Sequence, residues 1–439
     1  MLEDDCRNKY KDQPSDTVYE QIIVVGAGLG GLGAAVSLLL AGHDVQVFEA
    51  ASAIAEVGAG IQVLPNSSRI LQSWGMREML LQYATAPSHV NMLGWKGNLI
   101  SSMNTTESAS KYPGTFYWDF HRANLHKALL ERAVELGAVV KVNARVIDVK
   151  VNQHGETATV SLDTGEEFVT DLVVGADGIN TQLREMLLGK ADPPALTGDL
   201  AYRLLLSTKE MLKDPELAEF VQKPQVNYWL GPDAHAVNYV LRGGELFNMV
   251  LLVPDDMPAG AKTLEGNVEE MRALYKDWDP RIPKLLNLCE SVYKWRLCIR
   301  LGMDCWSHPS GAWTMMGDAV HATLPYLASG AGMCFEDAAV LGELFSRAAN
   351  PRNPKVKRQL LAIYEQCRKP RTEMIVKRGN KQQYLYHLHD GEEQVERDRK
   401  MREKEEGEAL AWRDIGLADK LLGYKVERDV STSICREVI

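Results

Sequence analysis

The sequence predicts a mixed α/β (α+β) fold in which a parallel-sheet domain carries an inserted antiparallel sheet and is followed by a helical C-terminal region. Residues 21–50 read as strand, glycine-rich turn, helix and strand, which is the pattern of a βαβ unit. Residues 195–300 hold several strand-like runs. Residues 312–317 again have the pattern of a strand followed by a glycine turn, as at the N-terminal end of the domain. A chain of 439 residues is long enough for about two or three domains of roughly 100–200 residues each.

The segment boundaries follow from these changes of pattern. We expect five segments: a flexible N-terminal arm (1–18), the first part of the parallel-sheet domain (19–190), the antiparallel-sheet domain (191–300), the second part of the parallel-sheet domain (301–350) and a helical C-terminal region (351–439).

Composition and charge exclude several classes of protein. Hydrophobic residues are 45% and charged residues 25% of the chain, which is usual for globular proteins and excludes collagen, coiled coil and general disorder. The net charge of −10, without a local basic patch, argues against a nucleic-acid partner. The longest apolar run, near residues 32–41, is far shorter than the ~20 residues of a membrane helix. We therefore expect a cytoplasmic protein, with no transmembrane segment.

The seven cysteines and ten histidines do not indicate a disulfide framework or a metal site. No two cysteines form a CxxC pair, and the odd number in a long chain favours free thiols in a reducing compartment. His387 and His389 have no Cys or carboxylate partner at the spacing of metal ligands. The sequence therefore predicts no bound metal.

The first element pair carries a dinucleotide-binding signature. A continuous apolar strand, Ile22–Val25, leads directly into Gly26-x-Gly28-x-x-Gly31 and a helix. The first glycine allows the tight turn, the second lets a pyrophosphate approach the backbone, and the third lets the helix pack on the strand. Glu49 ends the second strand, where an acidic side chain can bind ribose hydroxyls. This Rossmann-like motif predicts a bound dinucleotide but does not distinguish FAD from NAD.

Two later segments have the same style of strand followed by a polar turn. DLVVGADGINTQLR (171–184) places Asp177 in such a turn. MMGDAVHATLPYLASGAGMCFEDAAVL (315–341) places Asp318 in another, with Gly330-Ala331-Gly332 just before a helix. Asp318 could accept a hydrogen bond from a ribose or ribityl hydroxyl, and the helix N-terminus could face an anionic atom such as a reduced flavin C2 oxygen. Each turn alone could also be purely structural.

Taken together and in this order, these segments resemble the FAD-dependent aromatic hydroxylases, the single-component flavoprotein monooxygenases. The motifs are GAGLGG with Glu49, FHRANL with Arg122, GADGINTQLR, and GDAVHATLPYLASGAGMCFEDA. The resemblance covers about residues 20–380 and is strongest to the salicylate hydroxylase-like fungal branch. It implies an FAD-binding parallel-sheet domain and a substrate-binding domain at 191–300.

The resemblance also implies roles for individual residues. The ADP half of FAD would be held by the glycine turn and Glu49, and Asp177 would belong to a segment that serves both FAD and NAD(P)H. The flavin half would lie near a larger set: Gly60, Gln62, Arg122, Asp318, Pro325, Gly330, Ala331, Gly332 and Met333. Two positions depart from the family pattern, Asn124 after HRA and Thr181 in NTQLR. These departures leave the NAD(P)H contact less defined than the FAD contact.

The inserted domain supplies the candidate substrate residues. By resemblance to related fungal enzymes, Arg203 on the first strand could hold a phenolate or carboxylate, and Tyr239 could hydrogen-bond the same group. Tyr228 and Trp229 are candidates for substrate binding, and His235 could act as a base because the ordinary imidazole pKa is about 6.5. Each could instead be an ordinary sheet or core residue.

The expected function is that of an FAD-dependent monooxygenase. NAD(P)H would reduce FAD, and O2 would form a flavin C4a-hydroperoxide that hydroxylates a small aromatic substrate: a phenol, a salicylate-like acid or an aromatic or indole metabolite. The alternatives are an FAD-dependent dehydrogenase or reductase, and a non-catalytic flavin-binding redox protein. The protein would be a monomer or a homodimer.

Overall fold

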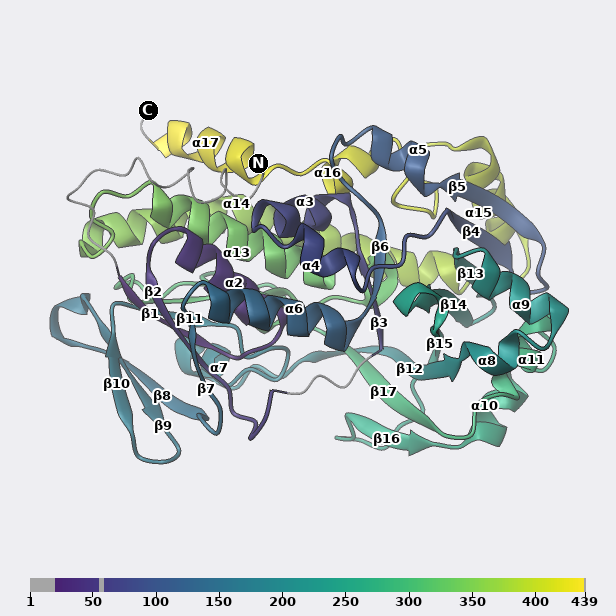
Figure 1. Ribbon diagram of the computed structural model, residues 1–439, viewed down its shortest axis with the longest axis horizontal. Coiled ribbons are helices and arrows are strands. Elements are labelled where there is room, and N and C mark those ends of the chain that lie inside the picture. The colour runs from purple at the N-terminus through teal and green to yellow at the C-terminus, as the bar shows by residue number, and fades with distance from the viewer. Residues whose placement is uncertain (1–19, 55–58, 438–439) are drawn as a thin grey trace.

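A five-stranded parallel sheet forms the centre of the larger half of the molecule (Figure 1). The computed structural model describes residues 20–54 and 59–437, so the N-terminal arm predicted for 1–18 lies outside the described residues. The sheet has the strand order β18-β11-β1-β2-β7. Its strands are β1 (Gln21–Val25), β2 (Asp44–Phe48), β7 (Val139–Lys141), β11 (Leu172–Gly175) and β18 (Trp313–Met315).

Residues 313–315 therefore return to the sheet that the N-terminal segment begins. Val173 pairs with Trp313, and Ile22 pairs with Leu172, so all three segments end at the same edge of the sheet. Because the carboxyl ends of parallel strands meet at one edge, the turns that follow β1, β11 and β18 lie side by side. This arrangement is the one expected for a parallel-sheet domain built from two separated parts.

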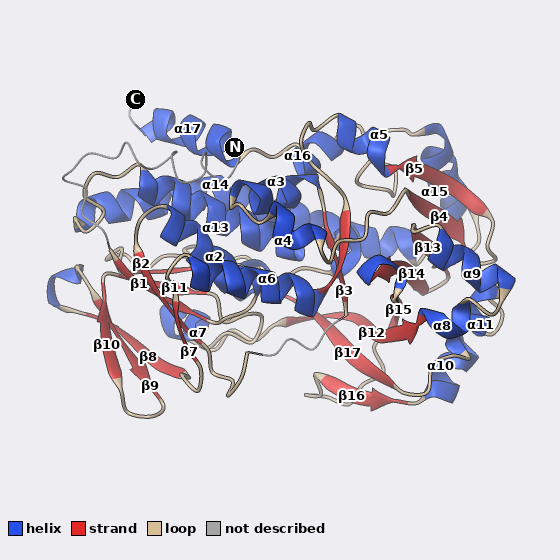
Figure 2. Ribbon diagram, in the orientation of Figure 1, coloured by secondary structure: helices blue, strands red, loops and turns tan. Residues whose placement is uncertain are grey.

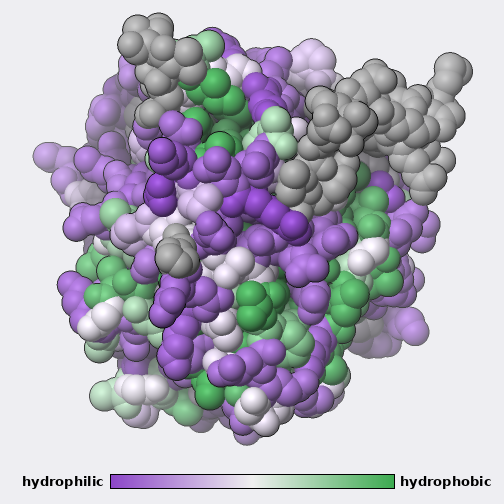
Figure 3. Space-filling model, turned by 90° about the vertical axis from the view of Figure 1, so that its left-hand side faces the viewer, coloured by the Kyte–Doolittle hydropathy of each residue, from purple (hydrophilic) through white to green (hydrophobic). Residues whose placement is uncertain are grey.

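Helices cover one face of this sheet and a small antiparallel sheet covers the other. Helix α2 (Leu29–Leu40) packs on β1 and β2 between α6 (Arg122–Glu135) and α13 (Gly330–Ser346). On the opposite face, the strands β8 (Val146–Val151), β9 (Ala158–Leu162) and β10 (Glu167–Thr170) form a three-stranded sheet. The apolar side chains of all three layers form one buried core. Figure 3 views the left-hand end of the molecule in Figure 1, and the surface of this end is mostly polar.

The inserted domain is an eight-stranded, largely antiparallel sheet (Figure 2). Its order is β16-β17-β12-β15-β14-β13-β4-β5. Six strands come from the expected segment: β12 (Ala195–Ser207), β13 (Val226–Gly231), β14 (Ala234–Leu241), β15 (Leu246–Pro254), β16 (Thr263–Gly266) and β17 (Val292–Ile299). Two strands come from earlier in the chain, β4 (His89–Gly94) and β5 (Leu99–Asn104), and β4 pairs parallel to β13. The sheet thus extends beyond the 191–300 segment that the sequence predicted.

The two faces of this sheet have different covers. One face packs against four short helices, α8 (Thr208–Met211), α9 (Pro215–Gln222), α10 (Val268–Leu274) and α11 (Arg281–Leu286). The last two of these helices, α10 and α11, are separated by residues 275–280. The other face packs against residues that follow β18 and against the C-terminal helices. It is this second face that borders the candidate site.

The C-terminal region is helical and links the two halves. Its helices are α14 (Pro354–Tyr386), α15 (Glu392–Glu403), α16 (Ala418–Leu422) and α17 (Val426–Glu437). No helix in the described part of the chain combines the length and apolar character needed to cross a bilayer. The remaining elements are β3 (Gly60–Val63), β6 (Trp118–His121), α3 (Pro65–Ser73), α4 (Arg77–Leu81), α5 (Thr105–Ser110), α7 (Leu183–Leu188), α12 (Asp318–His321) and the 3-10 turns η1 (Gln153–Gly155), η2 (Arg242–Gly244) and η3 (Pro325–Leu327).

Candidate active site

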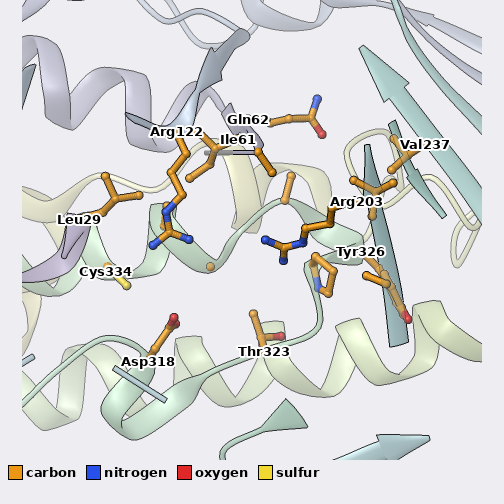
Figure 4. A pocket seen from close by; sticks show the side chains of 18 of the residues that line it. Leu29, Ile61, Gln62, Arg122, Arg203, Val237, Asp318, Thr323, Tyr326 and Cys334 are labelled. Atoms are coloured by element: carbon orange, nitrogen blue, oxygen red, sulfur yellow. The ribbon is translucent and has the colours of Figure 1, made fainter. Parts of the chain in front are cut away.

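A cavity of about 310 Å³ lies between the carboxyl edge of the parallel sheet and the inner face of the eight-stranded sheet. Both halves of the molecule contribute to it. Figure 4 shows Arg122 and Arg203 directing their guanidinium groups into this space, with Asp318 on the opposite wall. The cavity therefore joins the nucleotide-binding motifs to the inserted domain, as a site for a cofactor and a substrate requires.

The glycine turn is shaped to admit a ligand at one position only. A Cβ on Gly31 would lie 1.9 Å from the carbonyl oxygen of Gly26. A Cβ on Gly26, whose φ is +105°, would lie 2.5 Å from the carbonyl oxygen of Ala176. A Cβ on Gly28 would meet nothing within 4 Å, and Gly28 lines the cavity. The first and third glycines are thus needed for close packing, whereas the second faces open space. Gly28 also precedes α2, whose N-terminus has no side-chain cap, so its backbone N–H groups are available to a phosphate.

Glu49 stabilises the same turn. Its two carboxylate oxygens accept hydrogen bonds from the amides of Ala27 (2.9 Å) and Ala51 (2.8 Å). The side chain is therefore held at the end of β2 beside the turn, although it does not line the cavity. A ribose contact by Glu49 stays a prediction.

The far end of the cavity is formed by the segment after β18. Asp318 begins α12, directly after Gly317, whose φ is +62°. Gly330 and Ala331 open α13, which is 17 residues long and has no side-chain cap at its N-terminus. These residues and Pro325 all line the cavity. Two helix N-termini and the Arg122 cation thus face one cavity, which suits a dinucleotide with an anionic pyrophosphate and a polarisable ring.

Three further predicted cofactor residues, like Glu49, lie beside the cavity rather than in its wall. Asp177 caps α7, because its Oδ2 accepts from the amides of Gln182 (2.9 Å) and Leu183 (3.3 Å). Gly332 faces α3, and Met333 is 1% exposed in the core of the inserted-domain face. Their neighbours Ala176, Gly178 and Ala331 line the cavity instead. Backbone contacts from these segments remain compatible with the prediction, whereas the Met333 side chain is packed in the core and Oδ2 of Asp177 is held at the start of α7.

The prediction that Trp229 binds substrate is wrong in this structure. Trp229 is fully buried on the other face of the sheet, where its Nε1 donates to Asp279 (2.8 Å) and its ring packs on Phe220. The reason is strand geometry: successive residues point to opposite faces, so Tyr228 faces the cavity and Trp229 faces the α8–α11 core.

The same alternation brings the other substrate candidates together. Arg203 on β12 pairs with Val250 on β15, and Val250 pairs with Val237 on β14. His235 and Tyr239 lie two residues on either side of Val237, so all three side chains share one face and line the cavity. Gln62 from β3 joins them from the cofactor side. The cavity wall at this end is therefore an apolar sheet face with a few polar groups.

Arg203 is a partly buried cation without a carboxylate partner among the described residues. Its guanidinium lies 5.2 Å from the centre of the Trp295 ring. Burial and the nearby Arg122 cation lower the pKa of Arg203 from its ordinary value. Burial raises the pKa of Tyr239 and lowers that of His235, so Tyr239 is a phenol and His235 a neutral imidazole near pH 7. This end of the cavity thus carries one cation that an anionic ligand group would neutralise.

Two further residues support the site and were not identified from the sequence. Asp119 is fully buried behind the cavity and accepts from Gln62 Nε2 (3.0 Å); burial raises the pKa of Asp119 to about 8. Asn248 accepts from the Gly60 amide (2.7 Å). The position of Asp119 within the aromatic run TFYWDF could have indicated a buried carboxyl group. No local pattern could have indicated the role of Asn248, because its partner Gly60 is distant in sequence.

Comparisons with known proteins agree with this geometry. Residues 19–379 match the family model described as "FAD binding domain". The chain is 40% identical to the FAD-dependent monooxygenase OpS4 of Beauveria bassiana (strain ARSEF 2860), over 92% of this chain and 94% of that protein. It is 34% identical to 3-amino-4-hydroxybenzoate 2-monooxygenase PtmB3 of Streptomyces platensis, over 89% and 95%.

Solved structures show the same fold. The crystal structure of CtdE in complex with FAD and substrate matches with a TM-score of 0.81 at 18% identity, over 95% of this chain and 98% of that one. FAD is thus the cofactor of this chain, and its contacts with Gly28, Arg122 and Asp318 stay a prediction. The chain belongs to the family of FAD-dependent aromatic hydroxylases, the single-component flavoprotein monooxygenases.

Proposed function

We propose that this protein hydroxylates a small aromatic substrate that carries an acidic group, with NAD(P)H as electron donor and O2 as the source of the oxygen atom. The observation that carries the proposal is Arg203, a partly buried guanidinium in the cavity wall with no carboxylate partner among the described residues. A bound ligand would cover this cation further, and a covered cation without a counter-ion is costly, so the site favours a ligand that brings an anion.

The shape and chemistry of the cavity wall support an aromatic ligand. Ala201, Val237, Val250 and Leu252 provide an apolar floor, and the hydroxyls of Tyr228 and Tyr239 stand beside it. The substrate in the name of the Streptomyces relative, an aminohydroxybenzoate, carries both a carboxylate and a phenol. Either group could pair with Arg203, since a planar guanidinium binds carboxylates and phenolates alike.

The protein would position the substrate and control its ionisation. Bound FAD would supply the redox chemistry, accepting a hydride from NAD(P)H and, once reduced, activating O2 for insertion into the ring. The ring attacks more readily as a phenolate, so a cation at Arg203 that stabilises the phenolate and a neutral His235 that accepts the proton would both raise the rate. Closely packed walls would exclude water from the reaction.

A three-way assay tests this proposal. The purified protein, loaded with FAD, is mixed with NADH or NADPH and a panel of phenols, hydroxybenzoates and indoles, and NAD(P)H loss, O2 uptake and hydroxylated product are measured together. The proposal requires substrate-stimulated NAD(P)H oxidation, with one O2 consumed per product. Product formed without O2 uptake would instead indicate a dehydrogenase or reductase, and FAD binding with no stimulated oxidation by any compound would indicate a non-catalytic flavoprotein.

A further inference from the structure

His235 connects the cavity to a second histidine. It lines the cavity and is 1% exposed, with its ring packed edge-on against Tyr326 (4.7 Å) and Tyr386 (5.1 Å). Its Nδ1 lies 2.7 Å from Nε2 of His387, which follows the C-terminal end of α14. The Nδ1 atom is therefore occupied by His387, and Nε2 is the ring nitrogen left for a ligand in the cavity.

His387 reaches the outside of the molecule. Its side chain is 11% exposed and lines an open depression on the surface together with Asp233, Gln383 and Tyr384. Its Nδ1 lies 3.7 Å from Oδ2 of Asp199. The two imidazoles thus span the wall between the inner cavity and this outer depression.

A hydrogen bond between two imidazoles needs one hydrogen and one lone pair. One arrangement satisfies every neighbour: His235 donates through Nδ1–H, and His387 accepts at Nε2 and keeps its hydrogen on Nδ1, facing the Asp199 carboxylate. This arrangement leaves a lone pair on His235 Nε2, directed at the cavity. In the two rings together, each nitrogen nearer the cavity accepts a hydrogen bond and each nitrogen nearer the surface donates one.

We propose that His235 and His387 form a relay that moves the hydroxyl proton of a bound phenol from the cavity to the surface. The phenol O–H bond breaks and its proton binds His235 Nε2. The Nδ1 proton of His235 passes to His387 Nε2, and the Nδ1 proton of His387 passes to Asp199 or to water in the outer depression. The phenolate stays in the cavity beside Arg203. This inference rests on the proposed function, because it presumes a phenolic substrate.

The surroundings keep both rings neutral, as the relay needs. Burial lowers the pKa of His387 to about 4 and holds that of His235 well below its ordinary range. The titratable residues packed against the pair are Tyr326 and Tyr386, through their rings, and the carboxyls of Asp199 and Asp233 lie near His387. The Tyr275 hydroxyl donates to the His235 carbonyl oxygen (3.3 Å). Asp199 accepts from the Tyr326 hydroxyl and has its pKa raised by burial. Neutral imidazoles pass a proton without leaving a trapped charge in the wall.

The first test needs no substrate. In the FAD-loaded protein with ¹⁵N-labelled histidine, NMR distinguishes the two tautomers of His235, and the spectra of His387→Ala and His389→Ala assign the signals. The relay requires the Nδ1–H tautomer of His235 and a signal that changes when His387 is removed. A His235 ring with its hydrogen on Nε2 would overturn the relay, because that nitrogen could not accept a proton from the cavity.

The second test follows a proton directly. 4-Nitrophenol absorbs visible light only as the phenolate, so stopped-flow absorbance reports its ionisation in the cavity, and a pH indicator reports proton release. His387→Ala should slow both by about tenfold or more, the lower range for loss of a positioned proton carrier. Added imidazole should restore the rate by entering the space left by the side chain. His389→Ala is the matched control: His389 is 68% exposed and pairs with Asp233 (2.9 Å), so the rate should stay unchanged.

The outcomes separate the two proposals. Unchanged ionisation in His387→Ala, with FAD content and thermal unfolding as in the wild type, would overturn the relay and leave the proposed function standing. Wild-type protein that binds none of the phenols in the panel, 4-nitrophenol included, would contradict the proposed function; the tautomer of His235 would then still decide whether the wall is built for proton transfer.

Discussion

The backbone amide of Gly60 donates a 2.7 Å hydrogen bond to Oδ1 of Asn248, a residue 188 positions later in the chain. This bond joins β3, on the cofactor side of the cavity, to β15 in the eight-stranded sheet. Asn248 is fully buried. The bond therefore fixes the distance between the two walls of the cavity, and the Tyr239 ring fills the space beside it.

Gly60→Ala should disturb both walls. An added Cβ would lie 2.4 Å from Tyr239 Cε2 and 2.7 Å from Asn248 Cγ, so the strand or the ring must move. We expect reduced FAD retention and a loss of turnover of about tenfold or more, since small misplacements at a reacting centre are costly. The control is Gly302→Ala, where a Cβ would meet only the Glu373 carboxylate at 3.9 Å. Equal FAD content and turnover in the two variants would contradict the close contact.

Arg203→Ala should lower turnover without removing the flavin. The variant loses the cation that we propose pairs with the substrate anion, and a positioned charge or proton carrier of this kind contributes about 10²–10⁴ in rate. Arg203→Lys should recover little of it, because lysine lacks the planar fork. Leu205→Ala, at a 41% exposed position on the same strand, is the control. Wild-type product formation by Arg203→Ala would remove Arg203 from the reaction.

Asp318→Ala should lose flavin more than it loses fold. The Asp318 side chain faces the cavity from the start of α12, and hydrogen bonds to a charged group contribute about 1.5–3 kcal/mol. Flavin absorbance per mole of protein measures retention, and circular dichroism measures the fold. The exposed Asp304→Ala is the control. Should Asp318→Ala keep its full flavin content, Asp318 is only a turn residue.

Trp229→Phe should affect stability and leave the site unchanged. The variant leaves Asp279 without the Nε1–H donor in a buried setting, which costs about 1–3 kcal/mol in the free energy of unfolding. Urea unfolding measures this loss, while FAD content and turnover should match the wild type. A selective loss of substrate affinity with unchanged stability would restore Trp229 as a substrate residue.

Asp119 should make the stability fall as the pH rises. Its pKa is raised to about 8 in the folded protein, so the folded state holds a proton that the unfolded state releases near pH 4. The contribution of protonated Asp119 to the free energy of unfolding is therefore complete at low pH and is lost as the pH rises through about 8. Asp119→Asn, which is neutral throughout, should show a flatter dependence of the unfolding free energy over this range. The exposed Asp163→Asn should keep the wild-type slope.

The sequence was most informative where function depends on local backbone shape. The glycine turn, the strand before it and the Asp318 turn each lie within a few consecutive residues, and the structure places all of them at one edge of one sheet. Arg203, His235 and Tyr239 also reach the cavity together. Trp229 did not follow, because its direction depends on the register of β13, which neighbouring strands fix.

The partners of the site residues could not be predicted. Asn248, Asp119 and His387 meet Gly60, Gln62 and His235 through contacts between distant segments. His387 in particular lies at the C-terminal cap of α14, 152 positions after its partner His235. Such pairings depend on how helices and sheets pack, which no periodicity in a single chain records.

The parallel pairing of β4 with β13 also bears on how the protein is made. Asn91 and Asn227, which face each other across these strands, are 136 positions apart. At about 5–20 residues per second, a ribosome needs roughly 7–27 s to synthesise the chain between them. During that interval the β4–β5 hairpin has an unpaired edge strand, which is a hazard for aggregation. The edge stays exposed until β13 is made, so slower synthesis of residues 105–226 should lower the yield of folded protein, and a chaperone that shields residues 89–104 should raise it.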